Sequence, residues 1–509
     1  MMPGRAPLEP SPFGERVTCH RTAGRATGND AAGRPRPRAT RSLARPGLVG
    51  KAEGSLHCTM ESTGRREPVA AGIVIVGGGA GGLELACQLG RKLGSGRVTL
   101  VDRRLFHVWK PSLHEVAAGT LDIHQEGLSY LMLAHDNGFD FVYGAMQALD
   151  AAERTITVGE IRGEGGEIVV PRRELSYQAL VIAVGSTANY FGIPGAAEHS
   201  IALNGPDDAE RFRLRMLKIL TLAELEQAGS PAEPQALGRE RHGIDIVIIG
   251  GGATGVELAA ELREASQVHA NYGFRHLDPH RDVRITLVEG APRILAPLSE
   301  KVSDAAARLL AQRHVRVVTG CKVARIDAQG LEDEEGNRYP ADLCVWAAGI
   351  KAPDFLATLG LPTAKAGALE VDAHLRVKGH RDIYALGDCA FCIDGGGRPV
   401  PPRAQAAHQQ AAYLKDVLVR TAQGRPAAES PYVYRDHGSL VSIGTRSSVG
   451  SLMGSLFRST WFVEGIFARM MYASLHLLHH KAVLGTVRTG VLAIARFLVK
   501  RTTPLVKLH

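Results

Sequence analysis

Two glycine clusters of the same pattern stand far apart in the chain. The first, Gly77 to Gly82, is Gly-Gly-Gly-Ala-Gly-Gly, and the second, Gly250 to Gly255, is Gly-Gly-Gly-Ala-Thr-Gly. Both fit G-x-G-x-x-G, in which the first glycine makes a tight turn, the second lets the backbone approach a pyrophosphate, and the third lets a helix pack on a strand. The candidate phosphate-binding positions are Gly77, Gly79, Gly82, Gly250, Gly252 and Gly255.

An acidic residue follows each cluster, at the end of the next expected strand. Asp102 comes 20 residues after the first cluster, and Glu289 comes 34 residues after the second. We attribute the longer second spacing to an insertion at residues 266–283. A carboxylate in this place accepts hydrogen bonds from ribose hydroxyls and repels the 2′-phosphate that distinguishes NADPH from NADH. Glu289 therefore favours NADH, although Arg293, four residues later, weakens the preference.

These residues need strands and helices to hold them, and the surrounding pattern predicts both. Ile73–Val76 is a short, fully apolar run, as expected of a buried parallel strand, and a helical apolar period follows the first cluster. Residues 97–101 form the next expected strand. A strand at 245–249, a helix at 256–262 and a strand at 284–288 repeat this order. The sequence thus predicts an α/β protein with two Rossmann-like dinucleotide-binding domains.

Three further segments fit the same organisation. Residues 179–185 and 342–349 each have the pattern of a strand that ends in a glycine, Gly185 in one case and Gly349 in the other. We expect them to be matched elements, one in each nucleotide-binding fold. A charged helix is expected near residues 207–227.

Two acidic residues are candidates for roles beyond ribose binding. Two dinucleotide sites in one chain imply two-cofactor chemistry, most economically a nicotinamide that donates a hydride to a flavin, and the spacing does not say which site holds which cofactor. Glu257, two residues after Gly255, either complements a helix dipole or lies near the flavin and the nicotinamide. Asp388 follows Gly387 at the end of an expected strand, and it either points at the sugar-like chain of a cofactor or caps the next helix. Position alone leaves both alternatives open.

A helix that begins near Ala404 has two glutamines on one face, Gln405 and Gln409. Its small residues would let it come close to a flat ring. On spacing alone, however, a surface helix rich in alanine and glutamine is the simpler interpretation.

The chain has seven cysteines, an odd number scattered over a long sequence, which favours a reducing compartment over a disulfide framework. Only Cys389 and Cys392 are closely spaced, as C-x-x-C, and no second pair stands nearby to complete a zinc site. We predict a structural pair of thiols and no metal. A redox-active pair is the weaker alternative.

Both ends of the chain are basic, and the net charge is +8. Residues 1–69 show no apolar period and contain helix-breaking prolines, so we expect a disordered extension that is dispensable; an organelle transit peptide is the alternative.

Residues 431–509 carry ten Lys and Arg against two acids, interleaved with apolar helical faces. This pattern favours an amphipathic helix at a lipid surface and disfavours nucleic acid. Packing on the core or on a second subunit remains an alternative. No apolar run is long enough to predict a spanning helix.

With these motifs in hand, the chain resembles the type II NADH dehydrogenases, which are non-proton-pumping NADH:quinone oxidoreductases, and in particular their proteobacterial branch. These enzymes belong to the FAD-dependent pyridine nucleotide-disulfide oxidoreductase-like superfamily, with a glutathione-reductase-like fold of two dinucleotide-binding domains. The resemblance runs from about residue 71 to the end. It rests on the glycine clusters and on the segments 107–119, 345–354, 401–408, 434–441 and 506–509.

The resemblance implies roles for individual residues. The first unit would bind FAD and the second would bind NADH. Lys110, Gly185, Gly349 and Gly387 would contact the cofactors, and Asp388 would hold the ribityl chain of the flavin. Ala404, Gln405 and Gln409 would lie beside the isoalloxazine where quinone approaches, and Glu257 would be the acidic residue near flavin and nicotinamide. As a separate hypothesis, Glu257 together with His408 or His437 assists proton movement.

The resemblance also implies a layout and a location. The expected parts are a disordered extension at 1–69, an FAD-binding domain at 70–205 and 345–430, an NADH-binding domain at 206–344, and a membrane-anchoring helical region at 431–509. The protein would be peripheral, on the cytoplasmic face of the bacterial inner membrane, either as a monomer or as a homodimer. Two alternatives stay open: a sulfide:quinone type of flavoprotein, which would need reactive cysteines beside the flavin, and a redox-sensing flavoprotein that binds a partner.

Overall fold

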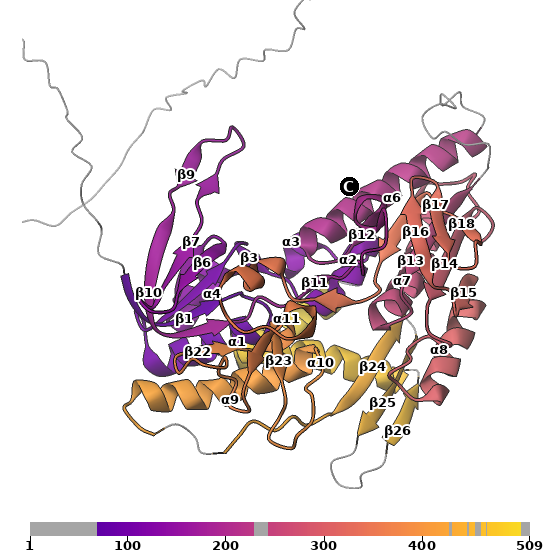
Figure 1. The fold of residues 1–509 in the computed structure, drawn as a ribbon. Helices are drawn as coiled ribbons and strands as arrows, with labels where there is room; N and C mark the ends of the chain where they lie inside the picture. The colour runs from indigo at the N-terminus through magenta and orange to yellow at the C-terminus, as the bar shows by residue number, and fades with distance from the viewer. Residues whose placement is uncertain are drawn as a thin grey trace, which may run out of the picture. The chain divides into compact units, whose positions relative to one another are not determined.

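The computed structural model describes residues 69–228, 243–426, 430–444, 447–453, 460–464 and 466–499 (Figure 1). The extension expected at 1–69 lies outside the described residues, except for Val69, which begins the first strand, β1 (Val69–Val76). The strand therefore starts four residues before Ile73, the first residue of the apolar run that predicted it.

The first sheet has seven strands and is built around β1. Parallel neighbours flank β1 on both sides, so its apolar residues 73–76 are buried. The strands, in sheet order, are β5 (Asp140–Tyr143), β2 (Val98–Asp102), β1, β10 (Arg173–Ile182), β7 (Thr155–Val158) and β6 (Met146–Asp150), with β22 (Ile383–Ala385) also paired to β10. The strand expected at 179–185 is the end of β10, which stops at Ile182 and pairs with β1.

The second sheet has five strands, all parallel. In order they are β12 (Ser200–Ala202), β19 (Leu343–Trp346), β13 (Ile244–Ile249), β14 (Val283–Glu289) and β15 (Val315–Thr319). In this sheet β19 pairs with β13 as β10 pairs with β1 in the first sheet, which confirms the matched strands. Both β12 and the end of β19 extend beyond the expected range 206–344, so the domain limits remain a proposal.

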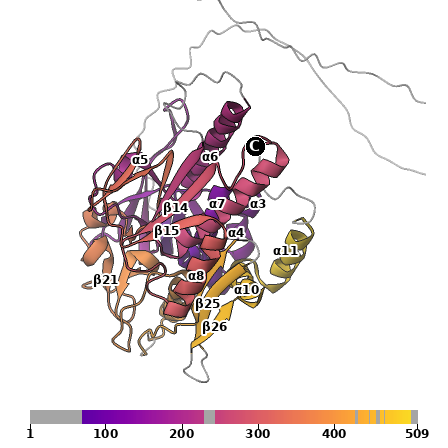
Figure 2. The same ribbon diagram turned by 90° about the vertical axis from the view of Figure 1, so that its right-hand side faces the viewer.

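Helices cover these sheets. In the first unit, α1 (Ala80–Leu93) follows the glycine cluster, and in the second unit α7 (Ala253–Tyr272) does the same. Figure 2 shows α7 and α8 (Glu300–Gln312) beside β14 and β15. The charged helix expected near 207–227 is confirmed as α6 (Pro206–Gln227).

The helix after the second glycine cluster is longer than predicted. The expected range was 256–262, with an insertion from 266 onward, but α7 continues to Tyr272. The insertion prediction was wrong for residues 266–272, because Ala265, Ser266 and His269 are buried and extend the packed face of the helix.

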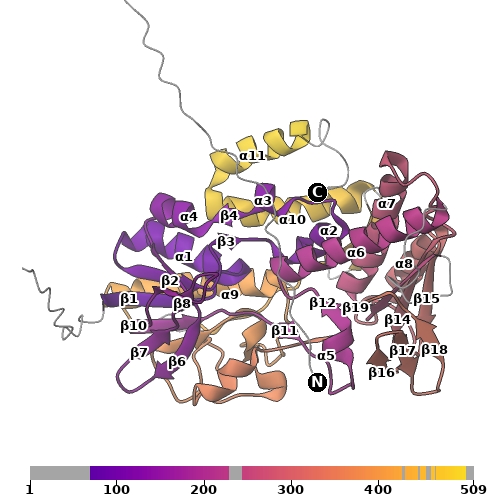
Figure 3. The same cartoon turned by 90° about the horizontal axis from the view of Figure 1, so that it is seen from above.

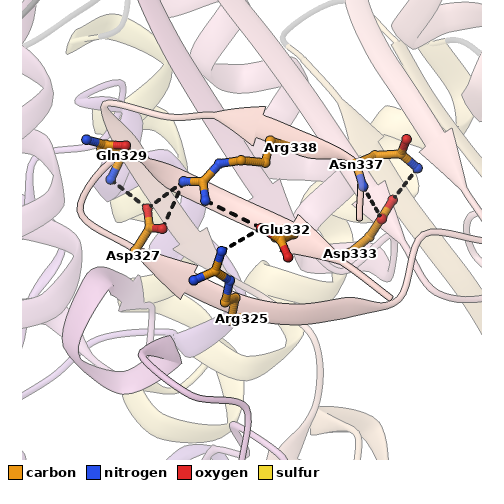
Figure 4. A network of polar contacts seen from close by, with 7 residues as sticks. All are labelled: Arg325, Asp327, Gln329, Glu332, Asp333, Asn337 and Arg338. Carbon is orange, nitrogen blue, oxygen red and sulfur yellow. Dashed lines mark hydrogen bonds and ion pairs between the residues drawn. The ribbon is translucent and has the colours of Figure 1, made fainter. Parts of the chain in front are cut away.

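Between β15 and β19 the chain forms a small antiparallel sheet of three strands: β16 (Val323–Asp327), β17 (Gly330–Asp333) and β18 (Arg338–Pro340). Figure 4 shows its polar network, in which Arg338 bridges Asp327 at 2.8 Å and Glu332 at 3.5 Å. These side chains are partly exposed to solvent, so each pair contributes little stability individually.

The C-terminal part begins with a sheet that the sequence analysis did not predict. After the helix α9 (Ala404–Ala422), three antiparallel strands follow: β24 (Gly438–Ile443), β25 (Ser447–Met453) and β26 (Thr460–Glu464). The two expected helices come next, α10 (Ile466–Leu484) and α11 (Thr486–Val499). Within the described part of the chain, no helix combines the length and apolar character needed to cross a membrane.

A buried carboxylate ties α10 to the first unit. Glu84 of α1 is 1% exposed. Its carboxylate accepts hydrogen bonds from Nδ1 of His408 in α9 at 2.5 Å and from Nδ1 of His479 in α10 at 2.7 Å. The other ring nitrogen of His479 lies 2.9 Å from His107 Nε2. Figure 3 shows α11 on the outer side of α10, near α4 (Tyr130–Asn137). The two C-terminal helices are therefore attached to the flank of the first unit.

Candidate active site

The first glycine turn has the geometry of a phosphate cradle. Gly77 has φ +104°, and a Cβ on it would stand 2.5 Å from the carbonyl oxygen of Ala183. A Cβ on Gly82 would stand 1.9 Å from the Gly77 carbonyl oxygen, which is the close contact of helix and strand. Gly79, at the N-terminus of α1, has extended backbone, and its nearest neighbour would be 4.0 Å away. Open space therefore remains where a pyrophosphate would lie.

The second turn repeats this geometry. Gly250 has φ +110°, and a Cβ on Gly255 would stand 1.9 Å from the Gly250 carbonyl oxygen. A Cβ on Gly252, at the N-terminus of α7, would meet nothing within 4 Å. Each unit thus leaves free space only at its second glycine, as dinucleotide binding requires.

Each predicted acid braces its glycine turn. Asp102 accepts the backbone N–H of Gly78 at 2.6 Å, and Glu289 accepts the backbone N–H of Gly251 at 2.6 Å. The second oxygen of each carboxylate accepts another backbone N–H, two residues beyond the acid. The carboxylate is thereby fixed at the strand end, and its remaining lone pairs stay available to ribose hydroxyls.

Arg293 does not offset the preference of Glu289 for NADH in this arrangement. Its guanidinium donates to the carbonyl oxygens of Ala296 at 2.7 Å and Leu298 at 2.9 Å. A guanidinium held by backbone carbonyls is not presented to a 2′-phosphate, so Arg293 does not counter the predicted preference of Glu289 for NADH.

Lys110 and Asp388, far apart in the sequence, meet at the carboxyl ends of the first sheet. Lys110 Nζ donates to the backbone oxygen of Ser186 at 3.0 Å, and Ser186 Oγ donates to Asp388 Oδ2 at 2.7 Å. Burial lowers the pKa of Lys110. The flanking Gly185 and Gly387 have φ of +70° and +74°. The cluster offers charged and polar groups to a sugar-like chain beside the first glycine turn.

Two members of this cluster were missed by the sequence analysis. Ser186 directly follows Gly185, a neighbour that could have indicated it. Gln410, 1% exposed, accepts the backbone N–H of Gly387 at 2.8 Å, but nothing in its spacing distinguishes it from Gln409. The helix-cap alternative for Asp388 was wrong, because a strand, β23 (Ala390–Cys392), and not a helix follows its short turn.

Gln405 and Gln409 attach α9 to the segment before β24. Gln405 Nε2 donates to Asp436 at 3.2 Å and to the Gly438 backbone at 3.1 Å, and Gln409 exchanges two hydrogen bonds with the Arg435 backbone. Ala404 is the first residue of the helix. The two amides therefore set the position of the loop at 435–438, and α9 is not a free surface helix.

Gly349 lies three residues after the end of β19, as Gly185 lies three residues after the end of β10 in the first unit. Its φ is +114°, and a Cβ there would stand 2.6 Å from the ring of Phe191. The position is therefore restricted to glycine by both backbone and contact.

Glu257 lies in the second turn of α7 and not in the first, so the helix-dipole interpretation loses its basis. Its carboxylate is 7% exposed, accepts the backbone N–H of Ser442 in β24 at 3.0 Å, and lies 3.6 Å from His114 Nδ1. Burial raises its pKa to about 7. A carboxyl group with this pKa exchanges protons at neutral pH.

Comparisons with known proteins agree with this geometry. A family model described as pyridine nucleotide-disulphide oxidoreductase matches residues 71–411. The chain is 36% identical to "Type II NADH:quinone oxidoreductase" of Haemophilus influenzae, over 86% of this chain and 99% of the relative. It is 30% identical to "Type II NADH:quinone oxidoreductase NdhA" of Mycobacterium tuberculosis, over 81% of this chain and 85% of the relative.

The chain belongs to the type II NADH:quinone oxidoreductases. Its fold is also that of the NDH2 of Plasmodium falciparum, solved in complex with NADH, with a TM-score of 0.70 at 20% identity over 86% of this chain and 99% of the other. The sulfide:quinone oxidoreductase of Aquifex aeolicus shares the fold less closely, with a TM-score of 0.61 at 18% identity over 82% of this chain and 92% of the other.

The burial of Cys389 and Cys392 argues against the alternative of a sulfide:quinone type of flavoprotein, which would need reactive cysteines. Cys389 and Cys392 are free and buried, and their sulfur atoms contact different backbone carbonyls. Burial raises the pKa of Cys389 to about 11 and that of Cys392 to about 12. Thiols with such pKa values are poor nucleophiles at neutral pH, as expected of a structural pair.

The open positions at Gly79 and Gly252 give a matched test of the two nucleotide sites. Alanine at either position fits the backbone and meets no protein atom closer than 4.0 Å, so the fold should persist. Gly79→Ala should reduce the flavin content of the purified protein. Gly252→Ala should leave flavin content unchanged and raise KM for NADH by at least about tenfold, or about 1.4 kcal/mol. Absorbance near 450 nm measures flavin content, and steady-state kinetics measure KM. Loss of flavin in Gly252→Ala together with a raised KM in Gly79→Ala would reverse the assignment of the two sites.

Proposed function

We propose that this protein oxidises NADH and reduces a membrane quinone to quinol without pumping protons. The supporting observation is the pair of complete glycine turns, each with a bracing acid and open space at its second glycine. FAD, when bound, accepts a hydride from NADH and passes two electrons to the quinone. The overall reaction consumes one proton from the medium for each NADH.

The polar cluster beside the first turn supports the assignment of FAD to that turn. Lys110, Ser186 and Asp388 surround the place where the chain between the flavin ring and the pyrophosphate would run. The second turn has Glu289, which suits the adenine ribose of NADH. We assign FAD to the first unit and NADH to the second, with domain limits near 70–205, 206–344 and 345–430.

Glu257 is our candidate for proton movement. It stands where α7 of the NADH unit meets β24 of the C-terminal sheet, with His114, Glu115 and Glu261 as its ionisable neighbours. Its pKa of about 7 makes the protonated form available at neutral pH. Ala404, Gln405 and Gln409, together with the loop they hold, define the side from which quinone approaches.

Anaerobic reduction tests the function directly. We expect NADH to bleach the flavin absorbance near 450 nm and a short-chain quinone to restore it rapidly. Bleaching without recovery would favour a redox-sensing flavoprotein that binds a partner. Absence of bleaching would show that NADH is not the donor.

Glu257→Gln should slow the quinone step at least about tenfold while leaving bleaching by NADH unchanged. Because the acid is protonated below its pKa, the rate of the native quinone step should fall as pH rises through about 7, and the variant should lose this dependence. Glu261→Gln is the matched control, since Glu261 is also buried but bonds to Thr120. Equal quinone rates in native protein and Glu257→Gln would refute the role.

We further propose that α11 lies on a lipid surface. Four apolar side chains at helical spacing are exposed by 58% to 81%: Val487, Val491, Ile494 and Leu498. Arg488 pairs with Asp136 of α4, where Leu131 and Met132 are also exposed. Such a face suits an interfacial helix. It agrees with a peripheral location at the cytoplasmic face of a bacterial inner membrane, where NADH is available.

Replacing Val491 and Ile494 together by glutamate should weaken binding to phospholipid vesicles at least about tenfold, because each apolar side chain contributes about 1.5–3 kcal/mol when fully buried. Vesicle co-sedimentation measures this, and NADH-dependent bleaching should not change. Glutamate at Ile168, a 53% exposed residue of a distant hairpin, is the control. Undiminished vesicle binding by the α11 variant would contradict the proposal.

A further inference from the structure

A cluster of three metal-ligating side chains joins the C-terminal region to the first unit. Glu126 ends the short helix α3 (Ile123–Glu126), while His476 and His480 stand one turn apart on α10. Their candidate ligand atoms all lie within 4.8 Å of one another. None of the three belongs to a glycine turn, but His107, whose Nδ1 lies 2.9 Å from the carbonyl oxygen of Gly78, lines the same pocket.

Hydrogen bonding fixes one of these ligands in the form that a metal requires. His480 is 2% exposed, and its Nδ1 lies 2.9 Å from the backbone carbonyl oxygen of His476. A carbonyl oxygen can only accept, so Nδ1 carries a proton, and in the neutral imidazole the lone pair is then on Nε2. A histidine that donates its other nitrogen to a carbonyl is the usual arrangement at metal sites.

Aromatic packing orients the second histidine. The rings of Trp109 and His476 are stacked, with centroids 6.1 Å apart and an interplanar angle of 12°. The rings of His476 and His480 lie 4.5 Å apart. Both imidazoles are therefore held before any ligand arrives, which lowers the cost of binding.

A small pocket opens at the cluster. Its lining includes all three side chains, together with His107, Trp109, Ser112 and Leu128. Its volume of about 10 Å³ is close to the space that a single water molecule needs. The pocket can therefore hold an ion or a single water molecule.

We propose that Glu126, His476 and His480 bind a divalent transition metal of the zinc class, with the fourth position open to the pocket. Two imidazoles and one carboxylate suit zinc, whereas calcium and magnesium prefer oxygen ligands alone. The site lies outside the proposed reaction. It cross-links α10 to α3, so the metal strengthens attachment of the C-terminal helices to the flavin-binding unit.

Cobalt(II) is a spectroscopic probe for this site in the full-length flavoprotein after chelator treatment. Tetrahedral cobalt absorbs between about 550 and 650 nm, where oxidised flavin is nearly transparent, and zinc should displace it. We expect a saturable band at one metal per cluster and a raised melting temperature with zinc. Glu126→Gln and His480→Ala should each weaken affinity at least tenfold.

Two controls make the result decisive. His199→Ala removes an exposed histidine from another part of the chain and should change nothing. Cys19, His20, His57 and Cys58 are also possible metal ligands. The proposed site is therefore identified by the difference in cobalt binding between the native protein and the Glu126 or His480 variants. Flavin content near 450 nm verifies folding, and Glu126→Gln nearly preserves shape if His480→Ala fails. Equal cobalt affinity in native protein and Glu126→Gln would overturn the proposal.

Discussion

The architecture depends on a close contact between a helix and the turn that precedes it, and this contact is present in both nucleotide-binding units. In each unit the third glycine of the cluster packs so tightly on the first that a Cβ would stand 1.9 Å from a carbonyl oxygen. Only this contact brings the N-terminus of a long helix against the end of the central strand. The free N–H groups of that helix and its dipole then face the space at the second glycine. The carboxylates of Asp102 and Glu289 hold the turns in this form.

The C-terminal region is bound to these units through two buried glutamates. Glu84 receives a histidine from α9 and another from α10, and Glu257 accepts a backbone N–H from β24. A buried carboxylate is costly unless it is paired or hydrogen-bonded, so removal of either set of partners would leave a strongly unfavourable group. The C-terminal helices and the two nucleotide-binding units are consequently parts of one cooperative structure.

The outer face of α11 and the inner face of α10 have different chemical characters. Exposed apolar side chains on α11 are suited to a lipid surface, while histidines on α10 point to Glu84 and to the pocket beside Trp109. A metal at that pocket would regulate attachment of the helices and leave the proposed path of hydride and electrons unchanged.

The sequence by itself determined the two βαβ units, their glycines and acids, and the helix that begins at Ala404, because these features depend on local spacing and on apolar periodicity. It also indicated the family through long ordered motifs. Tertiary structure alone decided that Lys110 meets Ser186 and Asp388, that the amides of Gln405 and Gln409 hold a loop, and that Glu257 is buried against β24. It decided as well that Glu126 lies beside His476 and His480. Each of these contacts joins residues from distant segments, and neither periodicity nor motif spacing carries information about which segments pack together.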